Sequence, residues 1–311
     1  MPINSNNSMM HSVYLPFSEE KVNEHFVKIK ENGKCNQNDI HINYYINSIN
    51  RYNEYMENNP ITQGKPIPKN DRQIEKDERF WTTSCLMTIY HSKNRQQELI
   101  KLFKKAYGDQ PPTEKIKSWE DCFDENLRLF FEPNLPSPEK HKKWLRENLK
   151  NRHFIPYVLD SAYKEKNLEG ATNVDALLIN PKNNFSVIIE AKVLSDISYS
   201  VTYDTMRNQI ARTIDVMLEE NTTLCDPLNN RDPKETLFLL ITPRCFQENP
   251  QSRFYGYKFN EYKNNPESIR ADLPHREPND ELKDISKRLG WLTWEDLNEE
   301  NKNCCKWLNI K

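Results

Sequence analysis

Three ionisable side chains fall inside two short apolar segments in the middle of the chain. Asp175 stands in NVDALLI, whereas Glu190 and Lys192 stand in FSVIIEAKV. Successive side chains of a strand point to opposite faces, so Glu190 and Lys192 are predicted to share one face. Charged side chains are rarely buried unless they are paired or bind a metal ion. The pattern therefore predicts an interior site with two acids and one amine.

The turn-forming sequence NPKNN between these segments predicts an antiparallel hairpin. Pairing of Ile179 with Phe185 or Ser186 places Asp175 opposite Glu190 or its neighbour, where opposed Cβ atoms are about 4.5–5.5 Å apart. Two carboxylates forced together repel each other unless a cation joins them. Because carboxylate oxygens are hard ligands, the ion that this pair favours is Mg²⁺ or Mn²⁺.

Composition limits the classes of protein to which the chain can belong. It has 311 residues, a mean hydropathy of −0.92, a net charge of −2 and a pI of about 6.4. No segment approaches the roughly 18 apolar residues that span a bilayer, and no secretory signal is visible, so we expect a cytoplasmic protein without a membrane segment. The seven cysteines show no CxxC spacing, which indicates a reducing compartment and argues against zinc.

The sequence divides into three predicted regions. Residues 1–132 form a mainly helical N-terminal region of unknown role, residues 133–260 form the core, and residues 261–311 form a helical extension packed on the core. Apolar periodicity and stop signals predict the helices outside the core. These helices cover residues 40–58, 78–92, 95–108, 281–290 and 293–301.

The core is predicted to run in the order helix, strand, strand, strand, helix, strand. A helix extends from Ser137 to Lys150, and HFIPYVLDSAYKE is the first strand. The hairpin supplies the next two strands. A helix with Asp204 as its N-cap continues to about Glu220, and the apolar ETLFLLIT is a buried central strand.

With this element order, the chain resembles the PD-(D/E)XK nuclease superfamily. The matching residues are Asp175, then Glu190-Ala191-Lys192, and Gln209 in RNQIAR on the following helix. The resemblance covers about residues 137–245, and Val174 stands where the family usually has proline. It implies an α/β restriction-endonuclease-like core, a mixed central sheet flanked by helices in the order αβββαβ, with the mainly helical N-terminal region added.

The resemblance implies a Mg²⁺-dependent or Mn²⁺-dependent nuclease. Asp175, Glu190 and the backbone carbonyl of Ala191 would hold the ion, which lowers the pKa of a water molecule and polarises the phosphoryl oxygen. Lys192 would orient that water or stabilise the developing negative charge. Gln209 would hold Lys192 or the water.

Members of the superfamily often add an acid from the first core helix, which nominates Glu147. Glu169, just before the hairpin, is the alternative acid. Arg212 lies about 60° from Gln209 around a helix and is a candidate phosphate ligand, whereas Arg207, about 200° away, is a weaker one.

Nucleic acid, and DNA before RNA, is the expected partner. The net charge argues against a protein that holds long duplex DNA by charge alone, so a local patch must contribute. Residues 139–152 carry six basic and two acidic side chains, although such a run is also typical of a solvated helix face. The common use of the family suggests restriction or antiviral defence, with a homodimer or a defence-system partner.

Two other functions stay open from the sequence. One is a metal-dependent hydrolase of RNA or another phosphodiester. The other is a non-catalytic module that binds nucleic acid or protein and keeps the nuclease fold. In that case Lys192 would form an internal salt bridge with Glu190 or Asp175, and no metal ion would bind.

Overall fold

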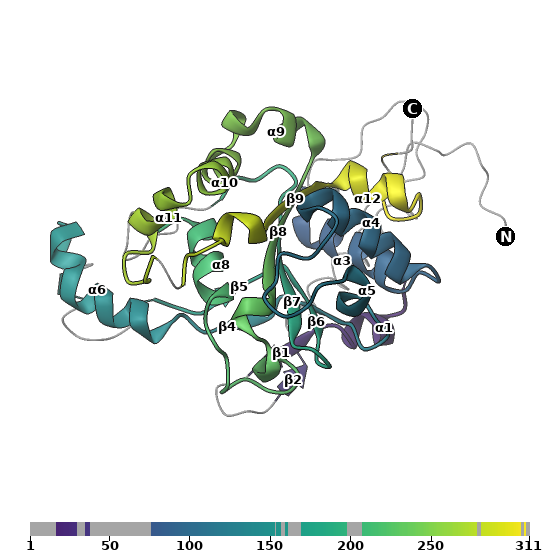
Figure 1. Cartoon of the computed structure of the whole chain (residues 1–311), viewed down its shortest axis with the longest axis horizontal. Coiled ribbons are helices and arrows are strands. Elements are labelled where there is room, and N and C mark those ends of the chain that lie inside the picture. Colours follow the sequence, from purple (N-terminus) through teal and green to yellow (C-terminus); the bar gives the residue numbers. More distant parts are fainter. Residues whose placement is uncertain are drawn as a thin grey trace, which may run out of the picture.

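The central feature of the computed structural model is a five-stranded mixed sheet between two layers of helices (Figure 1). The structure describes residues 17–29, 35–37, 76–152, 154–156, 159–160, 169–197, 207–278, 281–305 and 308. The helix predicted at 40–58 lies outside these residues. In the described part, no helix is long and apolar enough to cross a membrane.

The sheet has the strand order β3-β6-β7-β8-β9, and two pairs of short strands lie outside it. The strands are β1 (Val27–Ile29), β2 (Cys35–Gln37), β3 (Arg128–Phe131), β4 (Asn134–Leu135), β5 (Thr172–Asn173), β6 (Ala176–Asn180), β7 (Phe185–Ala191), β8 (Thr236–Thr242) and β9 (Leu289–Thr293). In the sheet, β3, β6 and β7 pair antiparallel, whereas β7, β8 and β9 pair parallel. The α/β class and the mixed central sheet are therefore confirmed.

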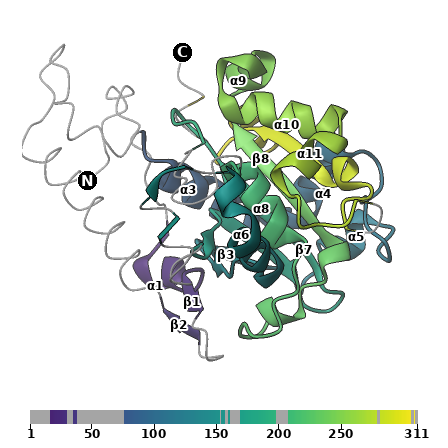
Figure 2. The same cartoon turned by 90° about the vertical axis from the view of Figure 1, so that its left-hand side faces the viewer.

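Helices cover both faces of the sheet. They are α1 (Glu19–Asn23), α3 (Glu78–Tyr90), α4 (Arg95–Tyr107), α5 (Trp119–Cys122), α6 (Glu139–Arg152), α8 (Gln209–Met217), α9 (Arg244–Glu248), α10 (Phe254–Asn264), α11 (Glu267–Asp272) and α12 (Trp294–Glu300). One apolar cluster joins α3, α4, α5 and α12 to one face, and a second joins α8, α10 and α11 to the other. Figure 2 turns the layer with α8 and α11 toward the viewer.

The hairpin of β6 and β7 has the predicted register. Ile179 pairs with Ser186, one of the two alternatives that the sequence left open. In the turn, the side chain of Asn180 accepts the N–H of Lys182, and Asn184 adopts φ 63°, a left-handed conformation that asparagine tolerates. Local turn chemistry thus fixes which side chains of the two strands face each other.

Two predicted elements are wrong. The described residues between 153 and 165 form no strand, because the N–H of Leu159 bonds to the carbonyl of Ile155 at 3.2 Å, as in a helical turn. The neighbour of β6 is instead β3, which precedes α6 in the chain. The helix predicted at 281–290 is a short turn at Ile285–Arg288 followed by strand β9.

The edges of the sheet come from outside the predicted core. β3 belongs to the predicted N-terminal region, and β9 belongs to the predicted C-terminal extension. The two central strands β7 and β8 are buried along their whole length, which agrees with the apolar runs in their sequences. The burial of the charged side chains Glu190 and Lys192 at the end of β7 therefore requires an explanation.

Candidate active site

The acid and the lysine of β7 form a buried ion pair. Glu190 is 0% exposed and Lys192 is 6% exposed. Lys192 Nζ donates to Glu190 Oε1 at 2.9 Å. This contact confirms that the two side chains share one face, the face that α8 covers.

Asp175 and Gln209 join this pair from the neighbouring elements. Asp175, just before β6, accepts the N–H of Ala191 at 2.7 Å through Oδ2. Gln209 is the first residue of α8, whose N-cap is Asn208, and its amide donates to Glu190 Oε1. The structure therefore brings together the four side chains Asp175, Glu190, Lys192 and Gln209. Asp204, the predicted N-cap, lies outside the described residues, and that prediction is wrong because the side chain of Asn208 caps a helix that runs only from Gln209 to Met217.

A further acid, which the sequence reasoning missed, comes from α3. Glu78 is the first residue of that helix, after the N-cap Asp77. Its Oε2 accepts the N–H of Val193 at 3.0 Å, and its Oε1 accepts the hydroxyl of Ser195 at 2.6 Å. Glu78 thereby holds the backbone that follows β7. No local signal marks it, since its helix carries an ordinary core pattern.

The charges of these residues shift one another's pKa values. Burial raises the pKa of Glu190 to about 8, partly offset by Lys192 and reinforced by Asp175. Burial also raises the pKa of Glu78, and Lys192 opposes that rise. Burial alone would lower the pKa of Lys192, but the surrounding carboxylates outweigh it and raise that pKa. Lys192 is therefore an ammonium ion at neutral pH.

The donor atoms suit a hard divalent ion. Glu190 Oε2 is buried and has no hydrogen-bond partner among the described residues. Asp175, Glu190 and Glu78 supply carboxylate oxygens, the ligands that hard divalent ions prefer, and a bound cation would favour the ionised form of Glu190 despite its burial. The three acids do not form a group whose ligand atoms, among the described residues, all lie within 4.8 Å. Binding of an ion would therefore require the carboxylates to exchange their present hydrogen bonds.

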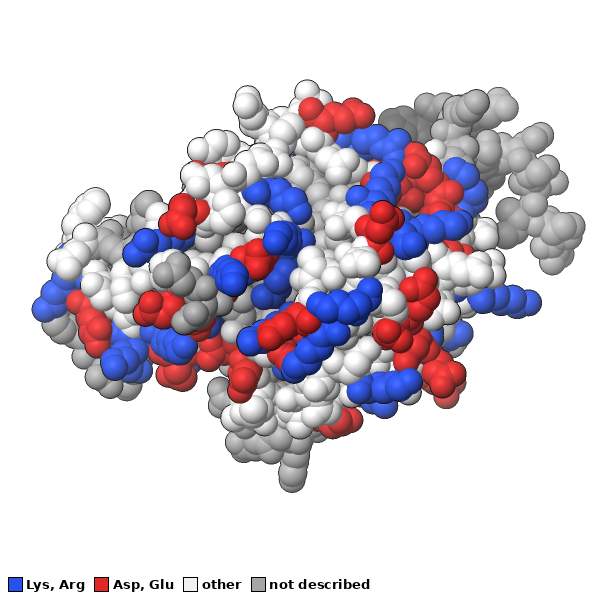
Figure 3. Space-filling model, in the orientation of Figure 1, with Lys and Arg blue, Asp and Glu red and all other residues white. Residues whose placement is uncertain are grey.

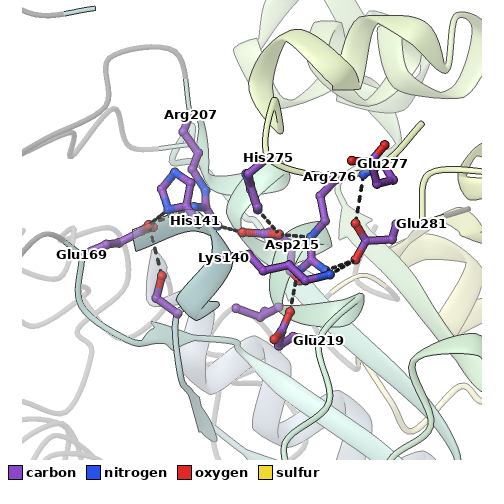
Figure 4. A network of polar contacts seen from close by, with 12 residues as sticks. Lys140, His141, Glu169, Arg207, Asp215, Glu219, His275, Arg276, Glu277 and Glu281 are labelled. Carbon is purple, nitrogen blue, oxygen red and sulfur yellow. Dashed lines mark hydrogen bonds and ion pairs between the residues drawn. The ribbon is translucent and has the colours of Figure 1, made fainter. Parts of the chain in front are cut away.

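The two acids predicted to complete the site lie elsewhere. Glu147 is exposed on α6, which projects at the left-hand edge of Figure 1. Glu169 belongs to a separate ion network, in which it pairs with Arg207 at 2.9 Å and with His141 at 2.5 Å (Figure 4). Among the described residues, Glu78 is the further acid whose charge acts on Glu190 and Lys192.

The same network holds both predicted phosphate ligands. Arg207 is 3% exposed and donates to Glu169 and to the buried Asp215. Arg207 is thus buried and paired with two carboxylates, and phosphate binding by Arg207 stays a prediction. Arg212 Nε lies 2.9 Å from Glu169, and its side chain is 27% exposed. Phosphate binding by Arg212 stays a prediction.

An open groove of about 1130 Å³ lies apart from the acid cluster. Its lining includes Lys115, Lys140, Asp232 and Glu281, but none of the site residues described above. Two of its lysines are paired with acids that also line it, Lys115 with Asp232 at 2.8 Å and Lys140 with Glu281 at 2.9 Å. Figure 3 shows the same mixture of basic and acidic side chains over the face of the molecule seen in Figure 1. The groove has the features of a solvated, charge-balanced surface.

Comparison of the chain with family models, with curated proteins and with solved structures finds no match.

Proposed function

We propose that the chain is a metal-dependent nuclease that hydrolyses phosphodiester bonds in DNA with Mg²⁺ or Mn²⁺. The observation that carries the proposal is the fully buried carboxylate of Glu190, with one unpartnered oxygen, beside Lys192 and near two more acids. Asp175 and Glu190 would hold the ion, with Glu78 close by. When bound, the ion supplies Lewis-acid activation of water and polarises the phosphate.

The other residues position the acids and compensate charge. Lys192 stays protonated, so it serves as a cation that stabilises negative charge developing on the phosphate rather than as a general base. Gln209 orients Glu190 through its amide N–H, and the N–H of Ala191 fixes Asp175. The indole N–H of Trp294 holds the backbone carbonyl of Lys192 at 2.9 Å.

DNA is the proposed substrate because of the family resemblance, and exposed basic residues on α6 support a nucleic-acid partner. Lys143 and Arg146 are exposed on that helix, whereas Lys140 and Lys142 are paired with acids. The same resemblance is the basis for two further parts of the proposal. One is a homodimer whose two subunits cleave the two strands of DNA, and the other is a role in defence.

Cleavage assays with matched variants test the proposal. The purified chain is incubated with plasmid, linear duplex, single-stranded DNA and RNA, with Mg²⁺ or Mn²⁺ and with an EDTA control. We expect wild type and Lys182→Ala, an exposed lysine in the turn of the same hairpin, to cleave DNA equally. Asp175→Asn and Lys192→Ala should be folded by circular dichroism and slower by about 100-fold or more. Equal cleavage by all four proteins would remove the assignment.

The alternative is a non-catalytic binding module. It is favoured by one observation, namely that Lys192 and Gln209 both already bond to Glu190 Oε1. In that case the purified chain would bind no divalent ion and cleave none of the four substrates. Nucleic acid would then bind equally well with EDTA present.

A further inference from the structure

Three cysteines from distant parts of the chain meet in the hydrophobic core. Cys85 lies on α3, whereas Cys304 and Cys305 lie in the turn that follows α12. All three are 0% exposed, and their sulfur atoms lie within 4.8 Å of one another. Sequence spacing did not reveal this cluster, because Cys85 and Cys305 are 220 residues apart.

The cluster is arranged as one close pair and a neighbour. The sulfur atoms of Cys85 and Cys305 are 2.8 Å apart, whereas those of Cys304 and Cys305 are 3.9 Å apart. The thiol of Cys304 donates to the carbonyl of Cys85 at 3.3 Å, and the thiol of Cys85 contacts the carbonyl of Cys304 at 3.4 Å. These contacts hold Cys85 and Cys305 side by side.

The geometry and the charges favour a sulfur–sulfur bond over a metal ion. Two thiolates on a tetrahedral zinc ion, with Zn–S of about 2.3 Å, would be about 3.8 Å apart, roughly 1 Å further than the close pair. Three thiolates and a divalent ion would also leave a charge of −3 + 2 = −1 in an apolar cluster. The carboxylates of Glu98 and Glu295 act on the same sulfurs and would oppose that charge. A disulfide is neutral and avoids this cost.

We propose that Cys85 and Cys305 are a redox site, which a peroxide converts into a disulfide joining α3 to the end of the chain. The thiolate of Cys305 attacks one oxygen of hydrogen peroxide, which breaks the O–O bond and gives a sulfenic acid and hydroxide. The sulfur of Cys85 then attacks the sulfenic sulfur, and water leaves. The balance is two thiols and one H₂O₂ giving one disulfide and two molecules of water.

The reactivity of the pair agrees with this assignment. Burial acts to raise the pKa of the Cys305 thiol, but its contacts with the sulfur atoms of Cys304 and Cys85 lower that pKa to about 6. Cys305 is therefore the nucleophile at neutral pH. Because the sulfurs are buried, oxidation requires local opening, and we expect it to be slower than oxidation of the exposed Cys245.

The bond would connect two elements that support the acid site. Helix α3 begins at Glu78, and α12 begins at Trp294, which donates to Lys192. The rings of Trp81 on α3 and Trp294 already pack edge to face at 5.6 Å. The redox inference rests on the thiol cluster alone and does not depend on the proposed nuclease activity.

Mass spectrometry of the full chain tests the inference. The reduced protein is treated with a molar excess of hydrogen peroxide, so that the faster oxidation of Cys245 does not exhaust the oxidant, and it is then alkylated and digested while unfolding is followed in parallel. We expect a Cys85–Cys305 peptide and, because the bond closes a loop of about 220 residues, a rise in Tm of about 5 °C or more. Cys304→Ser and Cys245→Ser should keep the cross-link, and Cys305→Ser should lose it.

Two results would overturn the inference. One is the absence of the Cys85–Cys305 peptide from oxidised wild type and from Cys304→Ser, which needs no variant at the paired positions themselves. The other is about one equivalent of zinc in the untreated protein, measured by elemental analysis, that Cys304→Ser lacks. The zinc result would identify a trithiolate metal site instead.

Discussion

Replacement of Asp215 by asparagine should destabilise the protein strongly. Asp215 is 0% exposed and accepts hydrogen bonds from Arg207, from Arg276 at 2.7 Å and from His275 at 2.9 Å (Figure 4). The asparagine would leave two buried guanidinium groups without their shared carboxylate. Breaking a buried ion pair in this way costs about 3–5 kcal/mol. At roughly 2–4 °C per kcal/mol, Tm should fall by at least about 6 °C at pH 7.

The loss should depend on pH in a defined direction. Burial alone would raise the pKa of Asp215, but Arg207, His275 and Arg276 hold it well below the usual value of 3.8. A depressed pKa means that the stabilisation is present above the unfolded-state pKa of 3.8 and is lost as the pH falls through the folded-state pKa. The difference in Tm between wild type and variant should therefore be largest near neutral pH and should narrow below about pH 4.

Differential scanning fluorimetry from pH 3 to pH 8 measures both effects. Asp284→Asn is the matched control, because Asp284 is 51% exposed in its side chain and pairs only with the neighbouring Lys287 in the contacts of the described residues. The control should change stability by less than about 1 kcal/mol. Equal losses of Tm in the two variants, or a difference that does not vary with pH, would refute the reasoning about the buried network.

Two further predictions concern packing and the site. Gly290→Ala should lower the free energy of unfolding by about 1–3 kcal/mol, because the added Cβ would lie 2.3 Å from the ring of Tyr107. Gly170→Ala is the control, since a Cβ at that position meets no atom within 4 Å. Chemical denaturation measures both variants, and equal losses of stability would contradict the packing argument. Glu78→Gln should keep the fold and weaken the apparent affinity for Mn²⁺ by about 10–100-fold. Titration with Mn²⁺ measures this affinity, and an unchanged value would show that Glu78 does not contribute to ion binding.

The hairpin and its charges could be predicted from sequence because their signals are local. Turn residues and apolar runs lie within about twenty residues of one another, and they limited the register to two alternatives, one of which the structure shows. The run VIIEAKV also indicated correctly that Glu190 is buried. Strand β8 was predictable for the same reason, since its apolar run requires burial on both faces.

The features that the sequence did not reveal depend on contacts between distant segments. Glu78 reaches the site only because α3 packs on the sheet with its first turn beside Val193. The edge strand beside β6 is β3, not the segment predicted at 153–165. The pairing of β3 with β6 joins segments that are distant in the chain, so no local sequence pattern reveals it. Residues 289–293 form a strand because β8 offers a free parallel edge, although their own pattern also fits a helix.

Binding of Mn²⁺ to protein stripped with EDTA tests the central claim most directly. Isothermal titration should show an ion bound by wild type and by Lys182→Ala, with Mg²⁺ competing for it. Glu190→Gln should weaken the affinity by at least about 100-fold, because it removes a ligand rather than a residue that only orients one. Equal Mn²⁺ affinity in wild type and Glu190→Gln, or no binding by wild type, would contradict an ion held at the end of β7.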